Sequence, residues 1–149
     1  MKVLILGGGP AGLATAGALK HHDIDSTILE RGGHVGTSWR NHYDRLHLHT
    51  VRSLSNLPNQ PIPKEMGKWV ARDDLVRYLE DYAKRQRLEV ETDVEAKRVE
   101  RDGDSWRVEP SRGERTAEIV VLATGYNAVP SARAGSGREA FNGGVRDPQ

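Results

Sequence analysis

The chain has 149 residues, which is one domain at most and short for a complete two-domain enzyme. Its 22 Lys and Arg residues are balanced by 21 acidic residues, so no overall field attracts nucleic acid or an anionic membrane surface. The chain contains no cysteine, which excludes disulfides, thiolate metal sites and cysteine nucleophiles. These features predict a globular domain that resides in a reducing cytoplasm.

The opening stretch, MKVLILGGGPAGLATAGALK, has three candidate explanations: a secretion signal, a membrane anchor or a phosphate-binding loop. A signal peptide needs an apolar core of roughly 7 to 15 residues, and a spanning helix needs roughly 20. Only residues 3–6 are strongly apolar, and the glycines and the proline that follow disfavour a continuous helix. The stretch therefore predicts a buried strand over 3–6, a tight turn, and a helix from Pro10 to about His21.

The next elements complete a strand–helix–strand unit. Residues 26–30 read as a second short strand, so a parallel sheet begins here. Residues 31–71 show no sustained period and predict loops with short helical turns. From Asp73 to about Gln86, apolar residues recur at helical spacing, with acids at the front and basic residues at the back, which predicts a helix.

The pattern then alternates from Val94 onward, with turns at Asp102-Gly103 and near residues 112–113, which predicts an antiparallel meander. The apolar run 119–123 predicts a strand buried on both faces. The expected fold class is α/β: a Rossmann-like domain whose parallel sheet carries an antiparallel β-meander. Residues 127–149 hold few large apolar side chains and predict a linker or disordered tail.

Three glycines between the first strand and its helix form the pattern G-x-G-x-x-G. Gly7 permits the tight turn, Gly9 lets the backbone approach a pyrophosphate, and Gly12 allows close packing of helix on strand. Glu30 ends the second strand, where a carboxylate accepts hydrogen bonds from an adenosine ribose and repels a 2′-phosphate. We therefore expect the first site to bind FAD or NAD rather than NADP. The adjacent Arg31 weakens the exclusion of NADP, because its positive charge would attract a 2′-phosphate.

Several blocks of the sequence, in order, resemble the flavin-containing monooxygenase family, especially its plant auxin-synthesis (YUCCA-like) branch and its bacterial relatives. The blocks are GGGPAGLATAGALK, ILERGGHVGTSWRNHYDRLHLHT, the helix ending in YLEDYAKR, SWRVE and VVLATGYNAVP, and they span roughly residues 2–130. The resemblance implies FAD as the cofactor. Family members transfer hydride from NADPH to the flavin and use O₂ to insert one oxygen atom into a substrate, chemistry that belongs to the cofactor.

The resemblance also assigns binding roles along the chain. The fingerprint would hold the pyrophosphate and Glu30 the ribose, Arg31 and residues 36–40 would line the approach to the flavin, and the backbone of Val94 would meet the adenine. The turn after the last strand would pass close to the cofactor. The residues assigned to FAD in this way are Gly7, Gly9, Pro10, Ala11, Gly12, Glu30, Arg31, Gly36, Thr37, Ser38, Trp39, Arg40, Val94, Thr124 and Gly125. No residue is predicted to be catalytic or to bind a metal.

The chain also departs from the family. A second G-x-G-x-x-G, for NADPH, is not found, and Asp147 stands where the linking signature that begins at Phe141 has histidine. The segment that families of this kind recruit from the end of the full chain is missing too. We therefore expect a truncated FAD-binding domain over 1–126, with no NADPH site, which a C-terminal region or a second chain would complete.

Two functions from different classes remain open. The first is an FAD-dependent, NADPH-consuming monooxygenase with an unassigned small-molecule substrate, of which this chain is the FAD-binding part. The second is a non-catalytic module that binds FAD or its ADP half, alone or with a partner. An NAD-dependent dehydrogenase is weaker, because the meander has no place in its usual plan. Disulfide reductases of similar architecture are excluded, because the chain has no cysteine.

Five further side chains have competing interpretations. His47 and His49 would share one strand face and bind a metal, but with no third ligand nearby a solvated face or a loop near the flavin is favoured. Trp39 would cover the cofactor or fill the core. Trp106 is expected to pack within the meander. Tyr126 is compatible with either a packing or a cofactor role.

Overall fold

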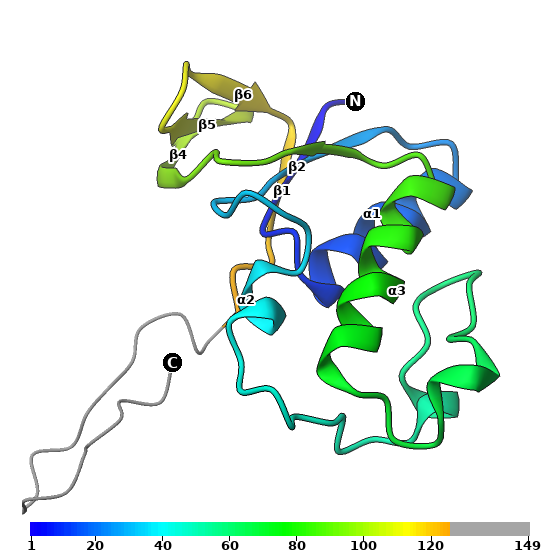
Figure 1. The fold of residues 1–149 in the computed structure, drawn as a ribbon. Helices are drawn as coiled ribbons and strands as arrows, with labels where there is room; N and C mark the ends of the chain where they lie inside the picture. The colour runs from blue at the N-terminus through cyan, green and yellow to red at the C-terminus, as the bar shows by residue number, and fades with distance from the viewer. Residues whose placement is uncertain (126–149) are drawn as a thin grey trace, which may run out of the picture.

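The structure is a computed structural model that describes residues 1–125 (Figure 1). Its centre is a four-stranded parallel sheet in the order β3-β2-β1-β7. The strands are β1 (Val3–Leu6), β2 (Ser26–Leu29), β3 (Glu89–Glu91) and β7 (Ile119–Leu122). The second sheet is the antiparallel meander β4 (Ala96–Asp102), β5 (Ser105–Pro110) and β6 (Arg115–Ala117). The expected fold class is confirmed.

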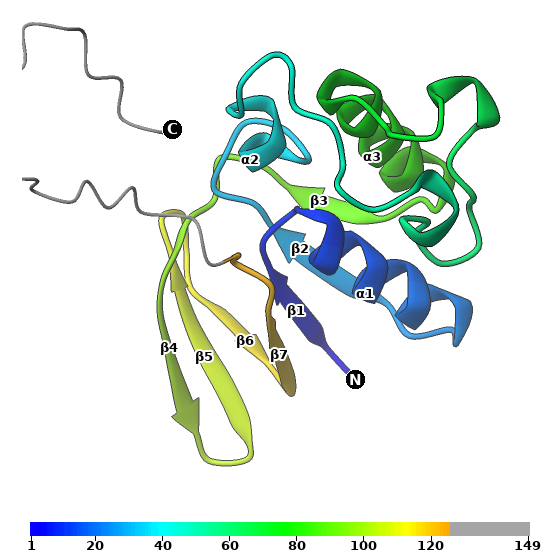
Figure 2. The same ribbon diagram turned by 90° about the horizontal axis from the view of Figure 1, so that it is seen from below.

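The opening stretch forms β1, a turn, and the helix α1 (Pro10–His21), as predicted. Every residue of β1 is buried, because the strand is paired on both edges and covered on both faces. Helices α1 and α3 (Arg72–Arg85) lie on one face of the parallel sheet, and the meander lies on the other (Figure 2). Within residues 1–125, no helix is both long and apolar enough to cross a bilayer.

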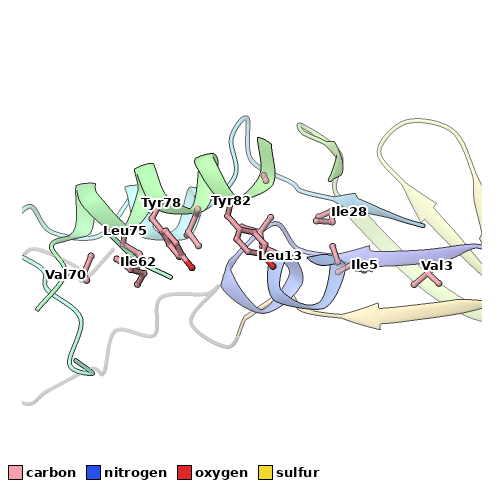
Figure 3. Close-up of a cluster of buried hydrophobic side chains, with 12 residues drawn as sticks. Val3, Ile5, Leu13, Ile28, Ile62, Val70, Leu75, Tyr78 and Tyr82 are labelled. Atoms are coloured by element: carbon pink, nitrogen blue, oxygen red, sulfur yellow. The ribbon is translucent and has the colours of Figure 1, made fainter. Parts of the chain in front are cut away.

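Two apolar cores follow from this layering. One joins β1, α1 and α3 through residues that include Ile5, Leu13 and Tyr82 (Figure 3). The other joins the opposite face of the sheet to the meander through Leu4, Val108 and their neighbours. Side chains that alternate along β1 therefore serve opposite cores, which is why the strand is apolar throughout.

Residues 31–71 form loops and short helical turns, as predicted. They contain α2 (Thr37–Arg40) and the single 3₁₀ turns η1 (Arg52–Leu54) and η2 (Lys64–Met66). The buried Tyr78 of α3 holds the loop, because its hydroxyl donates to the Gln60 carbonyl and accepts from the Leu57 amide. The loop is therefore fixed by a tertiary contact that no local pattern encodes.

Two expectations are corrected. The sequence analysis did not identify β3, a short edge strand whose only apolar residue is Val90. The prediction that residues 119–123 are buried on both faces is wrong, since Ile119 is 41% exposed and Leu122 is 70% exposed. In the described part of the chain β7 pairs only with β1, so it lies at the sheet edge and its ends lack covering neighbours.

Tyr126 and the predicted tail 127–149 lie outside the described residues.

The contact between α1 and α3 depends on a glycine. A Cβ atom at Gly17 would lie 1.9 Å from Tyr82 Oη, an overlap that requires a shift of the helices. Within residues 1–125 this buried hydroxyl has no hydrogen-bond partner. The phenol ring fills the core, while its oxygen contributes no bond.

We predict that Gly17→Ala lowers the free energy of unfolding by roughly 1–3 kcal/mol through overpacking. An ordinary Gly→Ala change inside a helix would instead raise it by about 0.5–1 kcal/mol. Urea unfolding followed by circular dichroism measures the difference. Tyr82→Phe removes the oxygen, which is the atom nearest to the added Cβ, and should restore part of the loss in the double variant, because the ring carbon Cζ still lies 2.8 Å from that position. A double variant no more stable than Gly17→Ala would contradict this contact.

The two buried tyrosines also predict a pH dependence. Burial raises the pKa of both Tyr78 and Tyr82 above the ordinary value of 10.0. For Tyr78, the hydrogen bond from the Leu57 amide lowers the pKa, but burial has the larger effect. The folded chain therefore keeps these protons after the unfolded chain begins to lose them, and stability falls as pH rises above about 10. Urea midpoints between pH 8 and 11 should fall less steeply for Tyr82→Phe than for the native chain. Equal slopes would exclude a contribution from Tyr82.

Candidate cofactor site

Three strand ends meet at one edge of the parallel sheet. Gly7 follows β1, Glu30 follows β2 and Ala123 follows β7. Backbone bonds carry the pairing past the strand ends, from the Gly7 amide to the Leu29 carbonyl at 2.8 Å and from the Ala123 amide to the Leu6 carbonyl at 2.9 Å. Ligands of open α/β sheets bind outside the carboxyl ends of the strands, where connections leave a strand in opposite directions. This edge is therefore the place to test for a cofactor.

Two fingerprint glycines are required by the fold itself. Gly7 has φ of +115°, and a Cβ there would lie 2.3 Å from the Ala123 carbonyl oxygen. A Cβ at Gly12 would lie 1.9 Å from the Gly7 carbonyl oxygen and 3.3 Å from Ile5 Cγ2. Gly7 thus permits the turn, and Gly12 permits close packing of α1 on β1.

Gly9 differs from both. Its backbone is extended, at φ −83° and ψ −174°, and no atom lies within 4 Å of a Cβ built at this position. Neither backbone strain nor packing accounts for a glycine here. Open space over this backbone is what close approach of a ligand requires, so the arrangement fits a bound diphosphate.

The start of α1 adds donors to this space. The helix has no side-chain cap, and Pro10 stands in its first turn. Free amides and the positive end of the helix dipole favour an anionic group beyond Gly9. The side chain of Ala11 is exposed at the same end.

Glu30 is the one buried charged residue among the described residues, at 7% exposure. Its Oε2 accepts from the Gly8 amide at 2.6 Å, and its Oε1 accepts from the Gly32 amide at 2.8 Å. The Gly8 carbonyl in turn accepts from the Gly36 amide at 3.0 Å. The carboxylate therefore ties the glycine turn to the second glycine-rich loop.

The residues predicted to line the flavin approach lie around α2. Gly36 precedes α2 with φ of +69°, and the Thr37 hydroxyl donates to the His34 carbonyl at 2.6 Å. Trp39 packs against the apolar core that joins α1 and α3. Arg40 forms an ion pair with Glu80 of α3. The neighbouring side chains of Arg31 and Ser38 are both exposed. Only the loop before α2 is bonded directly to the fingerprint turn.

Val94 and the last turn both lie next to the fingerprint. The Val94 amide donates to the Glu30 carbonyl at 2.9 Å, and the Val94 side chain is buried. The Thr124 Cα lies 3.3 Å from the position of a Cβ on Gly7, and Gly125 has φ of +73°. These contacts gather the predicted residues into one region, while their binding of a cofactor stays a prediction.

Sequence reasoning missed Gly8 and Gly32, whose amides hold the Glu30 carboxylate. A Cβ on Gly32 would also overlap the Thr37 side chain, with Oγ1 at 2.2 Å. The available signal was the Gly32-Gly33 pair, which follows Glu30 after one residue and resembles a second tight turn.

The histidine alternative gains no support. His47 and His49 are both exposed, and His47 Nδ1 lies 3.0 Å from the Arg45 carbonyl oxygen. In the part of the chain that the structure describes, no group of three His, Cys, Asp or Glu side chains is placed to hold a metal. Trp106 lies on β5, with the Arg101 guanidinium 5.6 Å from its ring, as expected for a meander residue.

The layered fold and its glycine turn define a dinucleotide-binding α/β domain. A family model described as pyridine nucleotide-disulphide oxidoreductase matches residues 4–143, so the chain belongs to that family. Indole-3-pyruvate monooxygenase YUCCA6 of Arabidopsis thaliana is 37% identical over 145 residues, which cover 93% of this chain. A CzcO-like uncharacterized oxidoreductase of Geobacillus kaustophilus (strain HTA426) is 34% identical and covers 83%.

Solved structures agree with this assignment. A flavin-containing monooxygenase from Stenotrophomonas maltophilia matches 94% of the chain with a TM-score of 0.83 and 28% identity. The resemblance to flavin monooxygenases predicted from the sequence is confirmed. The chain spans 35% of the length of the plant and Geobacillus relatives and 43% of the Stenotrophomonas chain.

We predict that Gly9→Val has little effect on folding, whereas Gly12→Val prevents it. The added side chain at residue 9 enters open space, so the thermal midpoint should change by no more than a few degrees. The same change at residue 12 overlaps the Gly7 carbonyl, and the chain should fail to fold. Circular dichroism melting compares the two variants. If Gly9→Val also unfolds the chain, Gly9 serves the fold rather than a ligand.

Proposed function

We propose that residues 1–126 are the FAD-binding domain of an NADPH-consuming flavin monooxygenase. The relatives support the class of enzyme, and the glycine turn with its neighbouring carboxylate supports the cofactor. The oxidation of a small molecule, the use of NADPH and a cytoplasmic location are proposed for the whole protein to which this domain corresponds.

The observation that carries the proposal is Gly9. The fold requires Gly7 and Gly12, whereas Gly9 faces open space at the start of α1. A glycine that the fold does not need, placed beside amide donors, is explained by a ligand whose phosphates approach the backbone closely.

Glu30 would bind the adenosine ribose. An ionised carboxylate offers about four acceptor positions, and two are taken by the Gly8 and Gly32 amides. The others are free to accept from ribose hydroxyls, while the negative charge disfavours a 2′-phosphate. These two amides also fix the carboxylate, so it would bind the ribose without further ordering.

The rest of the FAD would be surrounded by Arg31, residues 36–40, Val94 and the Thr124-Gly125 turn. When bound, the flavin supplies the redox chemistry, accepting hydride and using O₂. The chain's own residues bind the cofactor, orient it and exclude water. Trp39 packs into the core, so its share in this role would be to stiffen the loop rather than to cover the flavin.

A second candidate is a module that binds FAD or its ADP half without turnover. The site itself supports this candidate, because the glycine turn and Glu30 provide groups that bind a dinucleotide and need no redox step to do so.

We predict that the purified chain binds FAD in a one-to-one complex and becomes yellow. Gly9→Val should weaken binding at least tenfold, because the added side chain takes the space of the diphosphate. Ala18→Val, at an exposed position of the same helix, should bind like the native chain. Fluorescence quenching of added FAD measures the affinity. A native chain that leaves FAD unquenched would refute the proposal.

We also predict that the FAD-loaded chain, alone, consumes neither NADPH nor O₂ above the rate of free FAD. An oxygen electrode and absorbance at the NADPH band measure both. Bound flavin without NADPH or O₂ consumption would support the proposal that the chain is the FAD-binding domain of a larger enzyme. NADPH-driven O₂ uptake would instead show that the chain is catalytic by itself.

A further inference from the structure

A second concave surface lies apart from the predicted cofactor site. A cavity of about 310 Å³ lies between η1, η2 and the segment that leads into α3, and none of the residues predicted to bind FAD lines it. Its lining residues are Val51, Arg52, Ser53, Lys64, Gly67 and Lys68. The fold and the proposed FAD site leave this surface unexplained.

The charge of this cavity is of one sign. Three cations line it and no carboxylate does. None of the three takes part in an ion pair within residues 1–125. The cavity on the other side of η2 is lined by Glu65, Asp74, Glu80 and Asp81 as well as by two cations. The chain as a whole has nearly balanced charge, but around η2 the cations gather at one cavity and the carboxylates at the other.

Arg52 is held firmly at this cavity. Its amide donates to the Lys68 carbonyl at 2.9 Å, and its Nη1 donates to the Ile62 carbonyl at 3.0 Å. Its Nε is buried and has no hydrogen-bond partner among the described residues. A guanidinium offers five donor hydrogens, so most of its donor capacity is unused and its position is already fixed.

The neighbouring groups complete a binding surface for a small anion. Lys64 and Lys68 are exposed, with the Lys68 Nζ 5.4 Å from the centroid of the also exposed Trp69 ring, and the Ser53 hydroxyl adds a donor. Like charges that share a cavity repel one another, and a doubly charged anion removes that repulsion. The volume is near the lower limit of small-molecule cavities, roughly 300–1,000 Å³, so the ligand must be small.

We propose that this cavity binds the phosphate group of a small phosphorylated molecule, with Arg52 as the fixed donor and Lys64 and Lys68 as the mobile cations. A phosphate dianion presents several acceptor oxygens to these donors, and Arg and Lys are the side chains that proteins use to bind it. The Val51 side chain provides an apolar wall beside the charged group.

The test is an NMR titration of the full ¹⁵N-labelled chain with inorganic phosphate, with ionic strength held constant by chloride. Saturable shifts should occur in the amides of residues 51–53 and 64–68. Lys64→Ala/Lys68→Ala should weaken binding at least tenfold. The matched control is Lys97→Ala, an exposed lysine of β4 with no ion pair in the described region, and it should bind like the native chain.

The glycine turn is a second place where phosphate would bind, and Gly9→Val separates the two. Shifts at residues 51–68 that persist in Gly9→Val support the proposal, whether or not FAD binds the native chain. Shifts confined to residues 7–12, shifts that do not saturate, or equal affinity in the double-lysine variant would overturn it. A parallel titration with glycerol 3-phosphate tests the ester, and failure of the ester to bind would exclude a phosphorylated molecule as the ligand.

Discussion

The arrangement of this domain depends on one carboxylate. Glu30 follows β2 and accepts from the amides of Gly8 and Gly32, which belong to two separate glycine-rich turns. A carboxylate removed from water is costly unless it is hydrogen-bonded, and here two backbone donors compensate for the burial. The same bonds fix the loop before α2, whose Gly36 amide donates to Gly8. One side chain therefore sets the distance between the two glycine-rich turns.

That carboxylate acts within limits set by the sheet. Parallel pairing places the ends of β1, β2 and β7 at one edge, so residues distant in sequence meet there. Gly7 and Gly12 are glycines because neighbouring carbonyl oxygens leave no space for a Cβ, whereas Gly9 is free of that requirement. Within one fingerprint, the fold explains two glycines, and the third is the one whose identity points to a ligand.

The parts of this fold that the sequence predicts are those with local signals. β1, α1 and α3 have clear apolar periods and fitting ends, and their bounds agree with the structure within a residue or so. β3 was missed because Glu89 and Glu91 flank a single valine, a composition that suits an edge strand. The apolar run of β7 indicates a central strand, but exposure depends on which neighbours cover it. Likewise, the fingerprint and Glu30 were predicted as parts of one site, while the Gly32 contact depends on a loop conformation that no periodicity encodes.

The two proposed anion sites rest on different physical means. At the glycine turn the donors are backbone amides and a helix dipole, and the nearest ionised side chain is the negative Glu30. Such a site would attract a diphosphate by directed hydrogen bonds and would distinguish the attached sugar by its hydroxyls. The cavity between η1 and η2 instead gathers cationic side chains around one fixed guanidinium. Attraction there is mainly Coulombic, so it should weaken with salt more than binding at the amides does. A chain with a net charge of only +1 thus forms both surfaces by local arrangement rather than by an overall field.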